Sequence, residues 1–149
     1  MEPGAPPAAA PSSPPAVTGR PIDLDAGPTD PVGRWVAVVL AAAEPCLLLD
    51  ADGRVQALSA AAAELLGTTL AAAQGRPVES VLTLVDFSRR ALPVTDPVSA
   101  LPALRSVVHR VLARSLLRVQ PAGLRQPVTC DMVAAPLAGG AAVAFLLPV

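Results

Sequence analysis

The sequence predicts an α+β domain with a five-stranded antiparallel sheet, short helices on one face and an N-terminal helix covering part of the other. The order of predicted elements is the first reason, because two strands, several short helices and three further strands typically segregate into a sheet with helices on one side. Composition is the second, since 52% hydrophobic and 15% charged residues favour a packed globule. A length of 149 residues fits one domain.

The first 29 residues are predicted to be a disordered leader rich in Pro and Ala. Nine of the 18 prolines occur by position 31, among Ala, Gly, Ser and Thr, with no apolar periodicity. Such a segment cannot bury a core of its own. We therefore place the folded domain at residues 30–149 and interpret the leader as an inert extension, a tether or a partner-binding tail.

The N-terminal helix is predicted from a capping residue followed by helical periodicity. Asp30 can cap a helix whose first turn holds Pro31. Trp35 and Val39 then recur at helical spacing until Pro45 ends the run.

The next segment predicts a tight hairpin. Residues 46–49 are a continuous apolar run, and residues 54–58 alternate between polar and apolar. Asp52 and Gly53 lie between them and can adopt the positive φ values that a short hairpin turn requires.

Short helices are predicted in the middle of the chain. Ser59 is placed to cap a helix over residues 60–66, and Gly67 to end it. Asp96-Pro97 repeats the pairing of a cap with a proline before another helix, although Pro102 limits its regularity. Further helices are expected at residues 70–74, 78–85 and 98–104.

Beyond Val107 the pattern becomes extended again. Residues 116–119 and 128–133 flank a turn at 121–123 and predict a second hairpin. After Gly139-Gly140, residues 141–147 predict the last strand.

Several of these segments, taken in order, resemble the PAS domain family. The resemblance covers roughly residues 30–149 and rests on Glu44-Pro45, 50–55, Ser59 with 65–67, 75–78 and 128–147. Residues 96–98, 116–118 and 126–128 are similar to PAS variants that precede cyclic-dinucleotide signalling domains in bacterial proteins.

The resemblance implies a non-enzymatic sensor or protein-interaction module in bacterial signal transduction, which acts by dimerisation or by docking on a separate output protein. Two features depart from the family pattern. Ser59 stands where the family often carries Asn, and the chain ends at Leu147-Pro148-Val149 without the usual Asp-x-Thr ending. We therefore expect any signal to leave through a surface or an associated chain, such as a separate kinase, phosphatase or cyclase.

The resemblance also implies a space between helices and sheet. The candidates to line it are Ser59, Val81, Leu82, Leu84 and His109, and the alternative is that the chain's own Leu and Val side chains fill it. His109 is either a haem or metal ligand, as in some PAS proteins, or an ordinary surface histidine. The Asn-Cys-Arg-Phe run of the flavin-binding relatives does not occur, so no cofactor is expected, and neither haem nor an apolar small ligand is supported.

Catalysis is not predicted, because the chain has one His, no Lys and no Tyr, and no nucleophile and base can be paired. We assign no catalytic residue and no metal site. Cys46 and Cys130 are interpreted as buried free thiols, since no nearby Cys or His completes a zinc set.

Nucleic acid and membrane partners are not predicted either. The net charge is -1, and a basic stripe of Arg105, Arg110, Arg114 and Arg118 would be interrupted by the predicted strand. The most apolar stretch, residues 35–49, is interrupted by Glu44-Pro45 and is shorter than a membrane span. With no secretory signal at its start, the chain is expected in the cytoplasm.

The first and last predicted strands are apolar on both faces, although helices should cover only one face of this sheet. We expect these strands to lie side by side, with their second face covered by the N-terminal helix, by a second copy of the chain, or by both. A homodimer is therefore predicted. The residues assigned to the dimer or partner surface are Trp35, Val36, Val38, Val39, Leu40 and Phe145.

Two other functions stay open. The chain is alternatively a structural adaptor that recruits a partner through its proline-rich leader and senses no ligand. A small enzyme is the other alternative, disfavoured by the missing catalytic pair.

Overall fold

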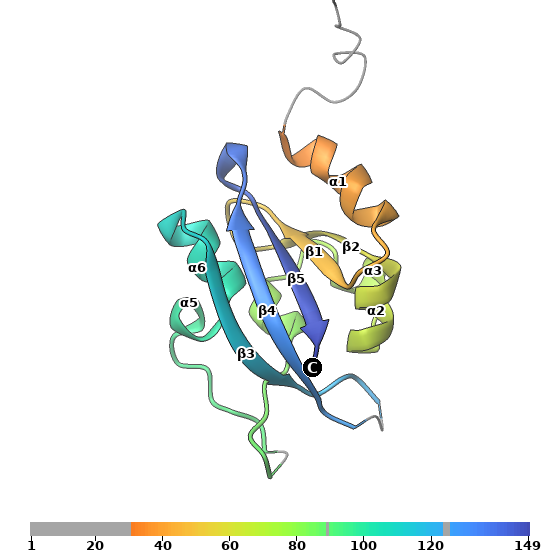
Figure 1. Cartoon of the computed structure of the whole chain (residues 1–149), viewed down its shortest axis with the longest axis vertical. Coiled ribbons are helices and arrows are strands. Elements are labelled where there is room, and N and C mark those ends of the chain that lie inside the picture. Colours follow the sequence, from red (N-terminus) through yellow and green to blue (C-terminus); the bar gives the residue numbers. More distant parts are fainter. Residues whose placement is uncertain (1–30, 89, 124–125) are drawn as a thin grey trace, which may run out of the picture.

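A five-stranded antiparallel sheet with helices on both sides forms the structure, a computed structural model that describes residues 31–88, 90–123 and 126–149 (Figure 1). The predicted leader and Asp30 lie outside the described residues. In chain order the elements are α1 (Pro31–Ala41), β1 (Cys46–Leu49), β2 (Val55–Leu58), α2 (Ala60–Leu66), α3 (Leu70–Ala73), α4 (Val78–Val81), α5 (Pro97–Ala100), α6 (Pro102–His109), β3 (Ala113–Val119), β4 (Val128–Pro136), the short helix η3 (Ala138–Gly140) and β5 (Ala142–Pro148).

The first and last strands lie side by side at the centre of the sheet, as predicted. The strand order is β2-β1-β5-β4-β3, and every neighbouring pair is antiparallel. Leu48 of β1 is opposite Val143 of β5. Side chains of both strands belong to hydrophobic clusters on the two faces of the sheet, which explains why these strands are largely apolar on both faces.

Local capping signals place α2 where the sequence predicts it. The Ser59 hydroxyl accepts a hydrogen bond from the backbone N–H of Ala62 at 3.1 Å. Gly67 ends the helix in the left-handed conformation, with φ of 69°, which a residue with a Cβ rarely adopts.

The predicted helix over residues 78–85 is wrong in its second half. The helix ends at Val81, and the following residues pair with the end of β3. The Val85 N–H donates to the Arg118 carbonyl at 2.9 Å, and Leu84 forms a bridge with Val119. Hydrogen bonding to a strand that is distant in sequence overrides the local helical pattern.

The single helix predicted at residues 98–104 is also wrong, because two helices meet there. Leu101 is extended, with φ of -115° and ψ of 117°, between α5 and α6. A residue that precedes a proline is disfavoured in the helical region, so Pro102 starts a new helix that continues to His109. The third strand also starts earlier than predicted, at Ala113, and the fourth ends later, at Pro136.

Two hydrophobic clusters lie on opposite faces of the sheet. The larger one fills the space between the inner face and helices α2 to α6 with Leu, Val and Ala side chains, for example Leu47, Leu104 and Leu146. In the smaller cluster, α1 packs through Val39 against Leu48 on the outer face. The prediction of a helix covering part of the second face is therefore confirmed.

No helix within the described parts of the chain combines the length and the apolar character needed to cross a membrane.

Candidate functional site

The structure does not bring the five predicted pocket residues together. Leu82 and Leu84 are buried in the inner core, and His109 is exposed in the last turn of α6. Ser59 is fully buried between β1 and α2. Val81 alone among the five borders the polar hollow described next.

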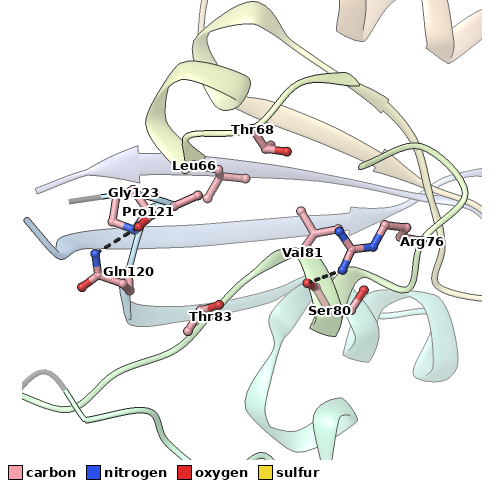
Figure 2. A pocket seen from close by; sticks show the side chains of 10 residues that line it. Leu66, Thr68, Arg76, Ser80, Val81, Thr83, Gln120, Pro121 and Gly123 are labelled. Atoms are coloured by element: carbon pink, nitrogen blue, oxygen red, sulfur yellow. Dashed lines mark hydrogen bonds between the residues drawn. The ribbon is translucent and has the colours of Figure 1, made fainter. Parts of the chain in front are cut away.

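A hollow of about 390 Å³ opens between the end of α2, helix α4 and the loop that joins β3 to β4 (Figure 2). Its walls carry one guanidinium, three hydroxyls, one carboxamide and four apolar side chains. The lining residues are Leu66, Thr68, Arg76, Ser80, Val81, Thr83, Gln120, Pro121, Ala122 and Gly123. The volume falls in the range of small-molecule sites.

Backbone hydrogen bonds hold the walls of this hollow in place. The Ala122 N–H donates to the Leu66 carbonyl at 3.0 Å, and the Gln120 N–H donates to the Thr83 carbonyl at 2.8 Å. A Cβ on Gly67 would lie 2.8 Å from the Ala122 oxygen, so this close approach needs glycine. Residues 120–122, which follow β3, are therefore attached both to the end of α2 and to the segment after α4.

Arg76 alone is charged among the described residues that line the hollow. Its Nη2 donates to the Ser80 carbonyl oxygen at 3.0 Å, an interaction drawn in Figure 2. The Ser80 hydroxyl in turn donates to the Pro77 carbonyl at 2.7 Å. These bonds fix the guanidinium at the C-terminal end of α4. Sequence reasoning used Arg76 only as part of a helix start and missed its position in the hollow.

The four arginines of the possible basic stripe do not form one surface, as expected from the interruption by β3. Each binds a different part of the chain. The arginines are Arg105, Arg110, Arg114 and Arg118, and their partners are respectively Ser99 with Ser115, Leu137 with Ala141, Asp131, and the Phe87 ring.

The predicted dimer surface divides into two sides of α1. Trp35, Val36 and Val39 face the sheet and belong to the outer hydrophobic cluster, together with Phe145 of β5. The other two, Val38 and Leu40, point away from the sheet and keep 54% and 46% of their surface exposed.

Beyond α1, the outer face of β3, β4 and β5 mixes apolar and charged side chains. Leu116, Asp131 and Leu147 form one row across the three strands. Leu116 is 68% exposed and Leu147 is 38% exposed. The Arg114 guanidinium binds the Asp131 carboxylate at 2.6 Å.

Both cysteines are buried free thiols. Cys46 lies in the outer cluster and Cys130 in the inner one, and burial raises the pKa of each thiol above its usual value of 9.0. Within the described residues, no group of three His, Cys, Asp or Glu side chains is arranged to hold a metal ion.

Two surface carboxylates are expected to make folding more sensitive to acid. Hydrogen bonds from Arg114 lower the pKa of Asp131, and a hydrogen bond from the Ser99 hydroxyl lowers the pKa of Asp96. Because the native pKa of the Asp131 carboxyl lies below its usual value of 3.8, the ionised carboxylate stabilises the fold at pH values above 3.8. This stabilisation is lost as the pH falls from 3.8 through the native pKa. Asp131→Asn should therefore lower Tm at neutral pH and flatten the decline of Tm with acid.

Thermal unfolding followed by circular dichroism between about pH 7 and about pH 2 measures this effect. Asp52→Asn is the control, because its exposed carboxylate has no hydrogen bond or ion pair within the described residues. Parallel curves for the wild type and Asp131→Asn would contradict the prediction.

Comparison with solved structures shows the same fold at low sequence identity. The PAS domain of an HTR-like protein from Haloarcula marismortui has a TM-score of 0.52 and 15% identity, with 78% of this chain and 89% of that chain covered. A domain of a sensory box sensor histidine kinase/response regulator from Geobacter sulfurreducens has a TM-score of 0.57 and 18% identity, with 76% and 90% covered. The PAS domain of a protein from Colwellia psychrerythraea has a TM-score of 0.56 and 12% identity, with 78% and 94% covered.

A comparison with curated proteins found no match. The sequence profile of the family described as the PAS fold matches residues 39–147, which is well over half of the chain. The matched region begins inside α1 and ends one residue before the end of β5, so it includes β1 to β4, nearly all of β5 and the helices on the inner face. On the strength of this match and the observed fold, the chain belongs to the PAS fold family.

Proposed function

We propose that this chain is a non-enzymatic sensory module that passes its signal on by contact with another protein chain. The proposal rests on its PAS fold and on one observation about its surface, the apolar residues left exposed on the outer side of the sheet. The similar Geobacter sulfurreducens structure is a domain of a sensor histidine kinase/response regulator, which supports a signalling role.

The proposed contact surface consists of the outward side of α1 and the neighbouring outer face of the sheet. Val38 and Leu40 are half exposed on α1, and Leu116 and Leu147 are exposed on the strands. Exposed apolar side chains on one side of a domain are typical of protein–protein contact surfaces. A second copy of the chain is the proposed occupant, since two such faces complement each other in a symmetric dimer.

The mixed charges of the outer face fit this occupant. Arg114 and Asp131 already neutralise each other, so pairing two copies would not bring an unpaired charge from this ion pair into the interface. The apolar neighbours would supply the binding free energy, and Asp131, which lies between Leu116 and Leu147, would enter the interface already paired with Arg114.

Sedimentation equilibrium of the full chain tests the proposal. We expect a dimer for the wild type and a monomer for Val38→Asp. The control is Val108→Asp on α6, because Val108 is the same residue type with the same 54% exposure and lies on a helix of the other face. It should remain dimeric. A monomeric wild type, or equal behaviour of the two variants, would contradict the proposed surface.

A further inference from the structure

We infer that the hollow between α2, α4 and the β3–β4 loop binds a small organic carboxylate. This inference rests on the proposed sensory role and names the class of ligand that would be sensed. Three features of the described residues support it: an arginine with no acidic partner among them, two hydroxyls with no hydrogen-bonding partner among them, and an apolar strip between the polar ends of the hollow.

The charge of the hollow selects an anion. Arg76 forms no ion pair with any carboxylate in the described part of the chain, and its guanidinium donates to a neutral carbonyl, that of Ser80. None of the ten lining residues is acidic. A guanidinium presents several donors in a planar fork that matches a carboxylate, and the bond to Ser80 leaves other donors available.

The hydroxyls add further donors and acceptors. Thr68 and Thr83 line the hollow, and neither hydroxyl has a hydrogen-bonding partner among the described residues. Figure 2 shows Thr68 on the wall after α2 and Thr83 on the segment after α4. A ligand held between them could form hydrogen bonds with both hydroxyls. Its binding would not have to break a hydrogen bond of these hydroxyls within the described protein, which would cost free energy.

The remaining walls define the middle and the far end of the ligand. Leu66 and Val81 supply apolar surface between Arg76 and Gln120. The Gln120 side-chain amide donates to the Pro121 carbonyl at 3.0 Å, which orients its polar group at the far end. The ligand is therefore a carboxylate with a short apolar body and a polar group that faces the Gln120 carboxamide.

Levulinate has these three parts and is the probe, and levulinamide is its uncharged analogue. Titration of the isotope-labelled full chain, followed by NMR, should shift the backbone amides of Thr68, Thr83 and Gln120 in a saturable manner. Levulinamide should bind about tenfold more weakly, which is the usual effect of losing a charge-assisted hydrogen bond.

Arg76→Gln should weaken levulinate binding by about tenfold and abolish the discrimination between levulinate and levulinamide. Thr83→Val should weaken it a few-fold with no loss of stability, since that hydroxyl has no partner in the described chain. Arg90→Gln is the matched control, because Arg90 is an exposed arginine that does not line the hollow, and it should bind as the wild type does.

Three results would overturn the inference: no saturable shift with levulinate, unchanged affinity in Arg76→Gln, or shifts with inorganic phosphate but not with levulinate. Sedimentation of the same samples keeps the two proposals separate. A dimer that does not bind levulinate would overturn the ligand inference alone, and a monomer that binds it would overturn the proposed contact surface alone.

Discussion

Val39→Asp is expected to unfold the domain, or to lower its free energy of unfolding by about 4 kcal/mol or more. Val39 is 1% exposed, and its side chain packs with Cys46 and Leu48 where α1 covers the outer face of the sheet. A carboxylate at this position would be buried against apolar groups. The loss is comparable with the whole stability of an ordinary domain.

Val38→Asp provides the comparison, because Val38 is adjacent in sequence but 54% exposed. Its carboxylate would remain in water, so the stability of the protomer should change by only about 0.5 kcal/mol. Urea unfolding followed by circular dichroism measures both variants, at a protein concentration where each is monomeric. Equal losses would show that α1 does not pack on the sheet through Val39.

Ser59→Ala is expected to cost about 3 kcal/mol, more than an ordinary helix cap. The Ser59 hydroxyl accepts hydrogen bonds from the N–H groups of Cys46 and Ala62, and it donates to the Glu44 carbonyl at 2.8 Å. Alanine would leave both N–H groups without their acceptor inside a buried site, because Ser59 is fully buried. The hydroxyl thus joins the start of β1 to the start of α2.

Thr69→Ala is the control for this prediction. Thr69 caps α3 through a single hydrogen bond from the Ala72 N–H, and this bond is exposed, so water can replace the lost oxygen. Its removal should cost about 1 kcal/mol. Chemical denaturation of the two variants would contradict the assigned role of Ser59 if both lost the same free energy.

The sequence predicted an element correctly where that element is fixed by residues close to it in the sequence. The bounds of α2 follow from Ser59 and Gly67, one supplying a capping oxygen and the other a left-handed terminus. The first hairpin likewise follows from Gly53, whose φ is 78°, although Asp52, for which a positive φ was also predicted, does not have one. These interactions join residues a few positions apart, and the amino-acid pattern contains both partners.

Hydrogen bonding to a segment far away in the sequence explains why the helix predicted after Val78 is too long. The helical pattern after Val78 continues through Val85, but the end of β3 offers backbone hydrogen bonds that a helix cannot use at the same time. A single-sequence pattern does not contain this competitor. Pro102 differs, because its restriction of the preceding residue was available from the sequence and indicated a new helix start.

The candidate ligand site likewise depends on contacts between segments that are far apart in the sequence. Arg76 and Thr83 are separated in sequence from Gln120, and no spacing rule connects them. Ser59 and Leu82 were reasonable candidates from their position in the family pattern, but both side chains are buried, Ser59 in hydrogen bonds and Leu82 in apolar contacts.

The sequence by itself determined the fold class, the capped helix α2, the first hairpin and the need to cover a second apolar face, because these follow from local turn chemistry and hydrophobic patterning. Only the tertiary structure decided which side of α1 is buried, where the helix after Val78 ends and which polar side chains share a hollow. Those outcomes depend on contacts between segments far apart in the chain, whose energies exceed the local preferences of the residues involved.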